Sequence, residues 1–170
     1  MRSVQKLAQI TLDEAIQIGD LTIDATIKHG DITRFLASRV GEAGKVLSFS
    51  ETKADIDDVA TSLFLSGLHE RVDLISKPYT DIPNYLDPTT PIGAAVFQIT
   101  AEDDQTALLT TVKMLLLNLK ENGIILLLAD QVESIADISE YAKKLPTNTY
   151  EVEQFTDLLI GESALLLQRK

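Results

Sequence analysis

The sequence predicts an α/β fold in which a seven-stranded, mostly parallel sheet has helices on both faces and ends in an antiparallel hairpin. Short β-rich runs alternate with helical patterns along the chain, which is typical of βαβ units and a largely parallel sheet. The last two β-rich runs, 149–155 and 163–168, are joined by a segment too short for a crossover helix, so they are expected to pair antiparallel. With 170 residues and no linker or repeat, residues 1–170 suit a single domain.

The first half of the chain contains three strands and two helices. Strands are expected at 21–26, 45–50 and 71–76, and helices at 31–40 and 53–66. Asp31 is a candidate N-cap for the first of these helices. Gly41 is expected to end the same helix.

The second half begins after a proline-containing segment, 77–91, which is expected to form a short helix or turn between loops. Further strands are expected at 94–100 and 124–129, and helices at about 108–119 and 133–145. The first of these helices carries leucines on one face, and Asn122-Gly123 is expected to close it.

Composition excludes several classes of site. The chain has no cysteine, which rules out disulfides, thiolate nucleophiles and cysteine-ligated metals, and its two histidines have no partners at ligand spacing. No metal site is therefore expected. The net charge of -11 argues against broad nonspecific nucleic-acid binding, which depends on neutralising phosphates.

The negative charge is unevenly distributed, because residues 1–50 hold six basic and six acidic residues. The basic residues of this neutral portion are compatible with a local basic face or with scattered, solvated charges. Those considered for a basic face are Arg2, Lys6, Lys28, Arg34 and Arg39.

The sequence favours a cytoplasmic protein without a membrane segment. Polar residues interrupt the first 15 positions, which is unlike a secretory signal. The longest wholly apolar run, 124–129, is far shorter than the roughly 20 residues that a membrane span needs.

The segment 24–31 is a candidate cofactor loop, because it joins a buried strand to a helix N-terminus. Such a loop is normally glycine-rich so that the backbone can approach the ligand. Here Gly30 is the only glycine, and it is expected to supply the special backbone geometry of the turn. Lys28 and His29 occupy positions where small residues are expected.

Five βα units followed by a hairpin resemble the Rossmann-like fold of class I S-adenosylmethionine (SAM) methyltransferases. The run Asp24-Ala25-Thr26-Ile27-Lys28-His29-Gly30-Asp31-Ile32-Thr33 and the following Phe35-Leu36-Ala37 are similar to the first motif of small bacterial rRNA methylase-like proteins. That family is associated with methylating an aminomethyl group on the wobble uridine of tRNA. Leu68-His69-Glu70 and 119–125 also resemble family segments. The resemblance implies SAM as cofactor and tRNA or rRNA as partner.

Several positions depart from the family pattern. Lys28 replaces the first glycine of the loop motif, and Ser50 stands where the family has an acidic residue that binds the ribose, with Glu51 one place later. A shift of one residue turns a side chain to the other face of a strand, although a loop conformation could let Glu51 reach. Gln98 keeps the amide of the substrate-side motif, but the rest of that motif and the one at 129–132 have changed.

The resemblance implies which residues form the site. Asp24, Thr26, Gly30, Glu51 and Gln98 are the expected cofactor-binding residues, and Gln98 is also the candidate catalytic residue, orienting an acceptor amine.

Other interpretations of these residues stay open. Asp24 could approach the methionine amino group of SAM, hold the turn through its own backbone contacts, or do both. His29 could act as a base or be an exposed loop residue, and Lys28 could meet a phosphate or carboxylate or occlude the site. The cluster 102–104 could attract a cation or simply cap a helix.

Two functions therefore follow from the sequence. One is a SAM-dependent methyltransferase acting on tRNA, rRNA or a small amine. The other is a catalytically inactive binding or interaction module with the same fold. A different nucleotide-binding Rossmann protein is disfavoured by the closing hairpin and the missing Gly-x-Gly-x-x-Gly. Leucine-rich edges could support a homodimer.

Overall fold

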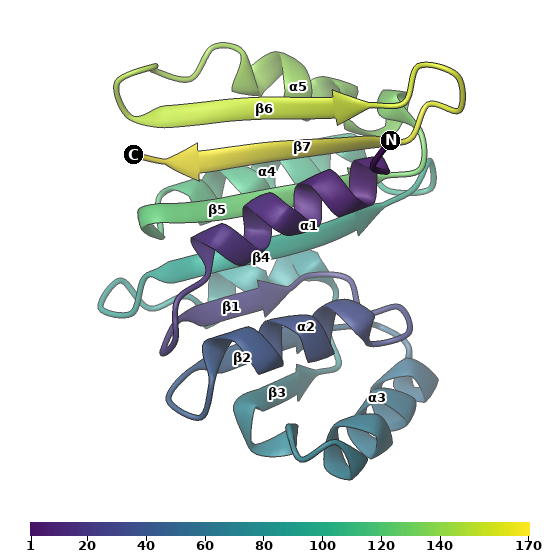
Figure 1. Cartoon of the computed structure of the whole chain (residues 1–170), viewed down its shortest axis with the longest axis vertical. Helices are drawn as coiled ribbons and strands as arrows, with labels where there is room; N and C mark the ends of the chain where they lie inside the picture. Colours follow the sequence, from purple (N-terminus) through teal and green to yellow (C-terminus); the bar gives the residue numbers. More distant parts are fainter.

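Seven strands form one sheet in the order β3-β2-β1-β4-β5-β7-β6 in the computed structural model, which describes residues 1–170 (Figure 1). Strands β1 to β5 pair with one another in parallel, and β7 pairs antiparallel with both β5 and β6. The predicted fold class and its closing hairpin are confirmed. The strands are β1 (Leu21–Asp24), β2 (Lys45–Phe49), β3 (Val72–Ile75), β4 (Ile92–Ile99), β5 (Leu119–Ala129), β6 (Tyr150–Thr156) and β7 (Ser163–Arg169).

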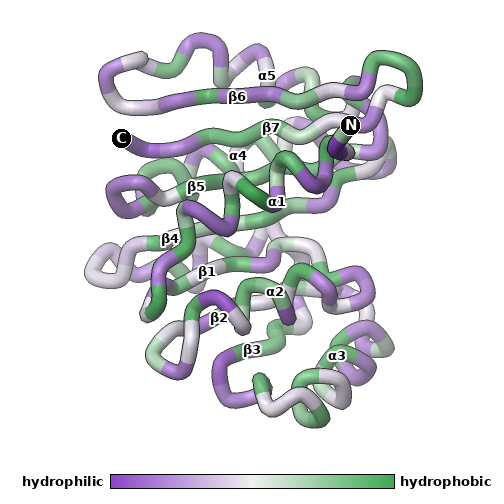
Figure 2. Tube along the Cα trace, viewed as in Figure 1, coloured by the Kyte–Doolittle hydropathy of each residue, from purple (hydrophilic) through white to green (hydrophobic).

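Helices cover both faces of the sheet and enclose two apolar cores. One face carries α1 (Val4–Ala15), α2 (Asp31–Val40) and α3 (Lys53–Leu65), and the other carries α4 (Gln105–Leu116), α5 (Ala136–Ala142) and the 3-10 segment η2 (Tyr79–Tyr85). Successive residues of β4 alternate between the two cores, with Ala94 and Val96 in one and Ala95 and Phe97 in the other. The central strands are therefore apolar on both sides, as Figure 2 shows for β4 and β5.

The N-terminal helix α1, for which the sequence analysis assigned no element, packs over β5 and β7. Its N-cap is Ser3, whose hydroxyl accepts a hydrogen bond from the backbone N–H of Lys6 at 3.1 Å. One side of the helix is buried at a spacing of four residues, through Val4, Ala8 and Leu12.

The boundary between α4 and β5 differs from the prediction. The helix ends at Leu116, and Asn122-Gly123 lies inside β5 instead of closing the helix. The chain turns at Asn118, whose carbonyl accepts from the Ile92 N–H at 2.8 Å, and this contact starts the pairing of β5 with β4. The expected helix 133–145 is also shorter, because a 3-10 turn, η3 (Val132–Ile135), precedes α5.

The outer strand β6 is largely exposed and forms one edge of the sheet, while the four-residue β3 forms the other. Exposed β6 residues include Glu151 and Glu153. No helix has the length and apolar character needed to cross a membrane.

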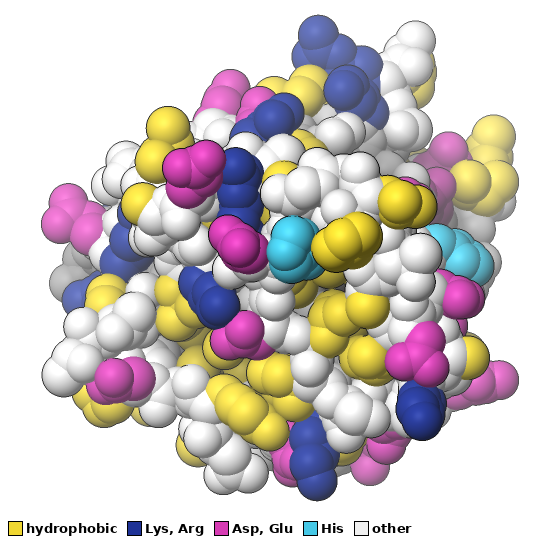
Figure 3. Space-filling view, turned by 90° about the horizontal axis from the view of Figure 1, so that it is seen from below, with side chains coloured by type: hydrophobic (Ala, Val, Ile, Leu, Met, Phe, Trp, Pro, Cys, Tyr) yellow, Lys and Arg dark blue, Asp and Glu magenta, His cyan; other side chains and the backbone are white.

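The basic residues considered for a local basic face are partly neutralised. Arg34 forms an ion pair with Asp31, and Arg39 forms one with Asp13. Figure 3 views the α3 end of the molecule and shows Lys and Arg side chains interspersed with Asp and Glu. On this side the charges are scattered and do not form a single basic patch.

Candidate functional site

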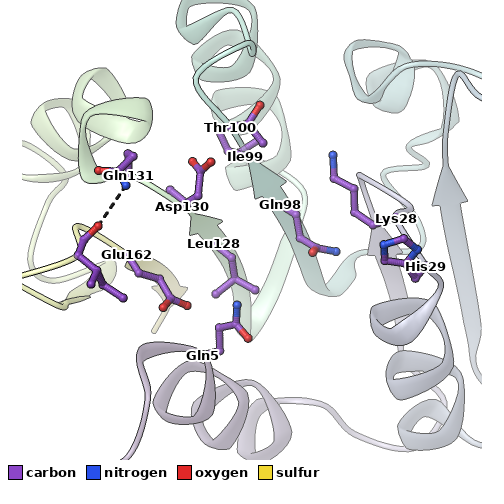
Figure 4. Close-up of a pocket in the computed structure, with 12 residues that line it drawn as sticks. Gln5, Lys28, His29, Gln98, Ile99, Thr100, Leu128, Asp130, Gln131 and Glu162 are labelled. Carbon is purple, nitrogen blue, oxygen red and sulfur yellow. Dashed lines mark hydrogen bonds between the residues drawn. The ribbon is translucent and has the colours of Figure 1, made fainter.

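Two neighbouring cavities open at the carboxyl ends of the central strands, where parallel α/β sheets bind ligands. We call them the β2-side cavity, of about 450 Å³, and the β5-side cavity, of about 630 Å³. Lys28 is the one residue that lines both. The β2-side cavity is otherwise lined by 25–27, 49–52, Asp55, 77–80, 102–104 and Ala107, and the β5-side cavity by Gln5, His29, 98–100, 128–131, Ile160 and Glu162 (Figure 4).

Asp24, at the end of β1, is buried beneath the β1–α2 loop and lines neither cavity. Its carboxylate accepts from the Thr33 hydroxyl at 2.7 Å and from the Thr26 N–H at 3.2 Å. The Thr33 oxygen also lies 2.9 Å from the Ser48 hydroxyl, so this network joins α2 to β1 and β2. Asp24 thus holds the turn, which is one of the two roles expected for it. The other role, contact with a cofactor, stays a prediction.

The environment of Asp24 changes its acidity. Burial raises the pKa of this carboxyl from 3.8 to about 6, and the hydrogen bonds from Thr33 and Thr26 counteract part of that rise. A group with these properties titrates in a mildly acidic range, which makes the fold sensitive to pH there.

Gly30 adopts a left-handed conformation with φ of 87° and precedes the first turn of α2. A Cβ at this position would lie 2.9 Å from a methyl of Val59 and 2.8 Å from the Arg34 guanidinium. The expected special geometry is confirmed. Asp31, in contrast, is not the N-cap, because Gly30 takes that position and Asp31 lies in the first turn, where its carboxylate pairs with Arg34.

Thr26 and Gln98 are brought together across β1 and β4. The Thr26 hydroxyl accepts from the backbone N–H of Gln98 at 2.7 Å, which fixes the two strand ends next to each other. Thr26 lines the β2-side cavity. The Gln98 side chain lines the β5-side cavity, where Figure 4 shows it between Lys28 and Leu128.

Glu51 lies in the loop after β2, which ends at Phe49. The Ser50 hydroxyl accepts from the Thr52 N–H at 3.1 Å and so turns the chain away from extended geometry. In this loop Glu51 lines the β2-side cavity, as expected if the loop lets it reach.

The cluster 102–104 is mainly structural. Asp104 caps α4 by accepting from the N–H groups of Thr106 and Ala107, and Asp103 accepts from the Thr100 N–H at 2.8 Å. The helix-capping interpretation therefore holds for Asp104, whereas Asp103 holds the turn between β4 and α4. The protein has no group of three or more His, Asp or Glu side chains arranged to hold a metal ion.

Tyr79 is a site residue that the sequence analysis did not identify. Its hydroxyl donates to Asp103 at 3.3 Å, and its ring packs edge-on against Phe97 at a centroid distance of 5.7 Å. Burial and the neighbouring Asp103 carboxylate raise the pKa of Tyr79, so the phenol stays protonated at neutral pH. Pro78 before it indicated a turn, but nothing local indicated its partner.

The wall of the β5-side cavity opposite Lys28 comes from the ends of β5 and the β6–β7 loop. The Gln131 side chain donates to the Ile160 carbonyl at 3.1 Å, and Gly161 leaves room for it, since a Cβ there would lie 2.5 Å from the Gln131 oxygen. Glu162 and Asp130 both line this wall of the cavity, with their carboxylates apart from each other (Figure 4). Sequence reasoning missed Glu162 because the loop reaches β5 only through tertiary contacts.

Comparisons with known proteins identify the fold. No family model matches the chain, and no curated protein is similar to it in sequence. An rRNA methylase-like protein from Clostridium thermocellum is 20% identical, with a TM-score of 0.90, and the match covers 100% of this chain and 99% of that one. A methyltransferase-like protein from Streptococcus mutans in complex with S-adenosylhomocysteine (SAH) is 20% identical, with a TM-score of 0.87 and the same coverage.

A third similar structure is an rRNA methylase from Streptococcus thermophilus, which is 19% identical, with a TM-score of 0.85 over 99% of this chain and 98% of that one. At these identities the comparisons show that the chain has the class I methyltransferase fold.

Proposed function

We propose that this chain is a SAM-dependent methyltransferase that holds its cofactor in the β2-side cavity and its methyl acceptor in the β5-side cavity. The observation that carries the proposal is that the two cavities meet at Lys28, beside the Thr26–Gln98 contact. A donor in one cavity and an acceptor in the other would be held next to each other. Such positioning supplies most of the catalysis that methyl transfer needs.

The residues of the β2-side cavity fit this cofactor. Glu51 would accept hydrogen bonds from the ribose hydroxyls, and Phe49, Pro78 and Ala107 offer apolar surface for the adenine. The cavity also contains a surplus of carboxylates, which suits the sulfonium and ammonium charges of the ligand. When bound, SAM would supply an electrophilic methyl group.

The β5-side cavity provides groups that could orient an amine. The Gln98 amide oxygen would accept an N–H from the acceptor, which would direct the nitrogen lone pair toward the junction at Lys28. Asp130 and Glu162 would stabilise positive charge on the opposite side. His29 lines the same cavity and would serve as the base.

For the acceptor we propose an amino group on a modified base of tRNA or rRNA in the cytoplasm. The sequence resemblance and the rRNA methylase names of two structural neighbours support this choice. A cavity of about 630 Å³ also suits a flipped-out base. Arg2 and Lys6 have no ion-pair partner and flank the cavity residue Gln5 along the chain, so they could contact phosphates.

The test combines ligand binding with methyl transfer. We expect SAH to bind with micromolar affinity in a calorimetric titration, and tritium from labelled SAM to appear in total tRNA or rRNA. Absence of SAH binding at millimolar concentration would contradict the proposal.

A second candidate function is a catalytically inactive binding module, favoured by the lysine that stands in the cofactor loop at position 28. It predicts that no RNA or amine is methylated under any condition that permits SAH binding. If SAH binds with micromolar affinity and methyl groups are transferred to small amines but not to RNA, the protein is a methyltransferase and the proposed RNA acceptor is wrong.

A further inference from the structure

Lys28 has an unusual position, because it is the only side chain shared by the two cavities. None of the five ion pairs in the protein involves it. The φ of Lys28 is not positive, so the backbone accepts a side chain here without the strain that a side chain at position 30 would cause. The lysine is therefore a free cation at the junction and is compatible with the fold of the loop.

The charges around the β2-side cavity are strongly asymmetric. Two lysines, Lys28 and Lys77, face a larger set of carboxylates. Lys77 follows β3, two strands away from β1 in the sheet, so Lys28 is the one cation lining this cavity at its β1 side. The carboxylates that line this cavity are Glu51, Asp55, Glu102, Asp103 and Asp104.

A cation would stabilise an amino-acid carboxylate bound in this cavity. SAM carries one such carboxylate, and the carboxylates that line the cavity would repel it wherever solvent does not screen their charges. Its methyl group has to face the β5-side cavity, which places the sulfur close to the junction. The carboxylate is separated from the sulfur by a short chain of three carbons, so it also lies within reach of the junction.

We infer that the Lys28 ammonium pairs with the methionine carboxylate of the cofactor and selects ligands that carry an amino-acid tail. This inference rests on the proposed function. It gives the lysine a binding role at a position where the resembling family has glycine. A charge-assisted contact of this kind replaces the closer backbone approach that glycine permits.

Two related ligands separate this role from a general effect on the cavity. SAH and 5′-methylthioadenosine share the adenosine and the thioether, but only SAH has the carboxylate and the ammonium group. We expect Lys28→Met to weaken SAH binding about tenfold in a calorimetric titration, because a charged hydrogen bond is lost. Binding of 5′-methylthioadenosine should change little.

Two further variants control the measurement. Lys28→Arg keeps the charge and should retain most of the preference for SAH over 5′-methylthioadenosine. Lys77→Met removes the other lysine of the same cavity and should leave the ratio of the two affinities unchanged. Circular dichroism of each variant checks that the fold is intact.

The possible failures are distinguishable. An unchanged or increased SAH affinity in Lys28→Met, or an equal loss for both ligands, would overturn the role of Lys28 while leaving the methyltransferase proposal in place. If the unmodified protein binds neither ligand, the proposed function fails and this inference fails with it.

Discussion

The buried carboxyl of Asp24 should make the protein less stable as the pH rises from about 4 to about 6. In the folded state its pKa is about 6, whereas an unperturbed aspartate titrates near 3.8. Between these values the folded protein keeps the proton and the unfolded chain loses it. Unfolding therefore releases a proton in this range, and the free energy of unfolding falls with rising pH.

The expected size of the effect follows from the two pKa values. Their difference corresponds to about 3 kcal/mol of stability, lost progressively between pH 4 and 6 and constant above that range. Asp24→Asn removes the titration. Its amide can still accept from the Thr26 N–H and donate to the Thr33 oxygen, which in turn can donate to Ser48.

Urea unfolding of both proteins from pH 3.5 to 7.5 measures this effect. All other carboxyls are shared, so the difference between the two stability curves isolates Asp24. Asp24→Asn should match the unmodified protein at the acidic end and exceed it by up to about 3 kcal/mol at pH 7. Parallel curves would refute the reasoning. In Thr33→Val the loss should extend to higher pH, because the hydrogen bond that lowers the pKa of Asp24 is absent.

Four further substitutions, one of them a control, test the loop and the proposed site. Gly30→Ala should cost at least about 2 kcal/mol in urea unfolding, because it adds a steric clash to a left-handed backbone. Gly67 has a similar φ, but a Cβ there would have no atom within 4 Å, so Gly67→Ala should cost only about 1 kcal/mol. Equal losses for the two variants would exclude the steric clash at position 30. Glu51→Ala should weaken SAH and 5′-methylthioadenosine by the same factor, about tenfold, since both carry the ribose; a loss for SAH alone would place Glu51 at the tail. Gln98→Ala should lower kcat for the acceptor with SAH affinity unchanged, and a fall in SAH affinity would move Gln98 to the cofactor.

The sheet was predictable from sequence because its central strands are apolar on both faces and clear turn or helix patterns separate the β-rich runs. The closing hairpin followed from the length of the segment 156–162 alone. The end of α4 was not predictable in the same way. The leucines from Leu115 to Leu119 satisfy a helical face and a buried strand equally well, and the pairing of Asn118 with Ile92 decides between them.

The candidate site was predictable only where a residue follows directly from a strand end. Glu51 and Gln98 line the cavities as their positions after β2 and at the end of β4 suggest. Tyr79 and Glu162 reach the cavities through contacts with residues distant in the sequence, such as Asp103 for the first. Asp24 was identified, but its burial under the loop depends on Thr33 and Ser48, which no local pattern connects.

The exposed edge strand β6 bears on how copies of this chain can meet. An unpaired strand edge is a template for sheet extension, and natural proteins commonly protect it with charge. If two β6 strands paired antiparallel about a twofold axis, Glu151 and Glu153 of each copy would approach carboxylates of the other. The acidic side chains of β6 thus oppose edge-to-edge pairing of two sheets. They disfavour aggregation through β6, which is the longer of the two edge strands.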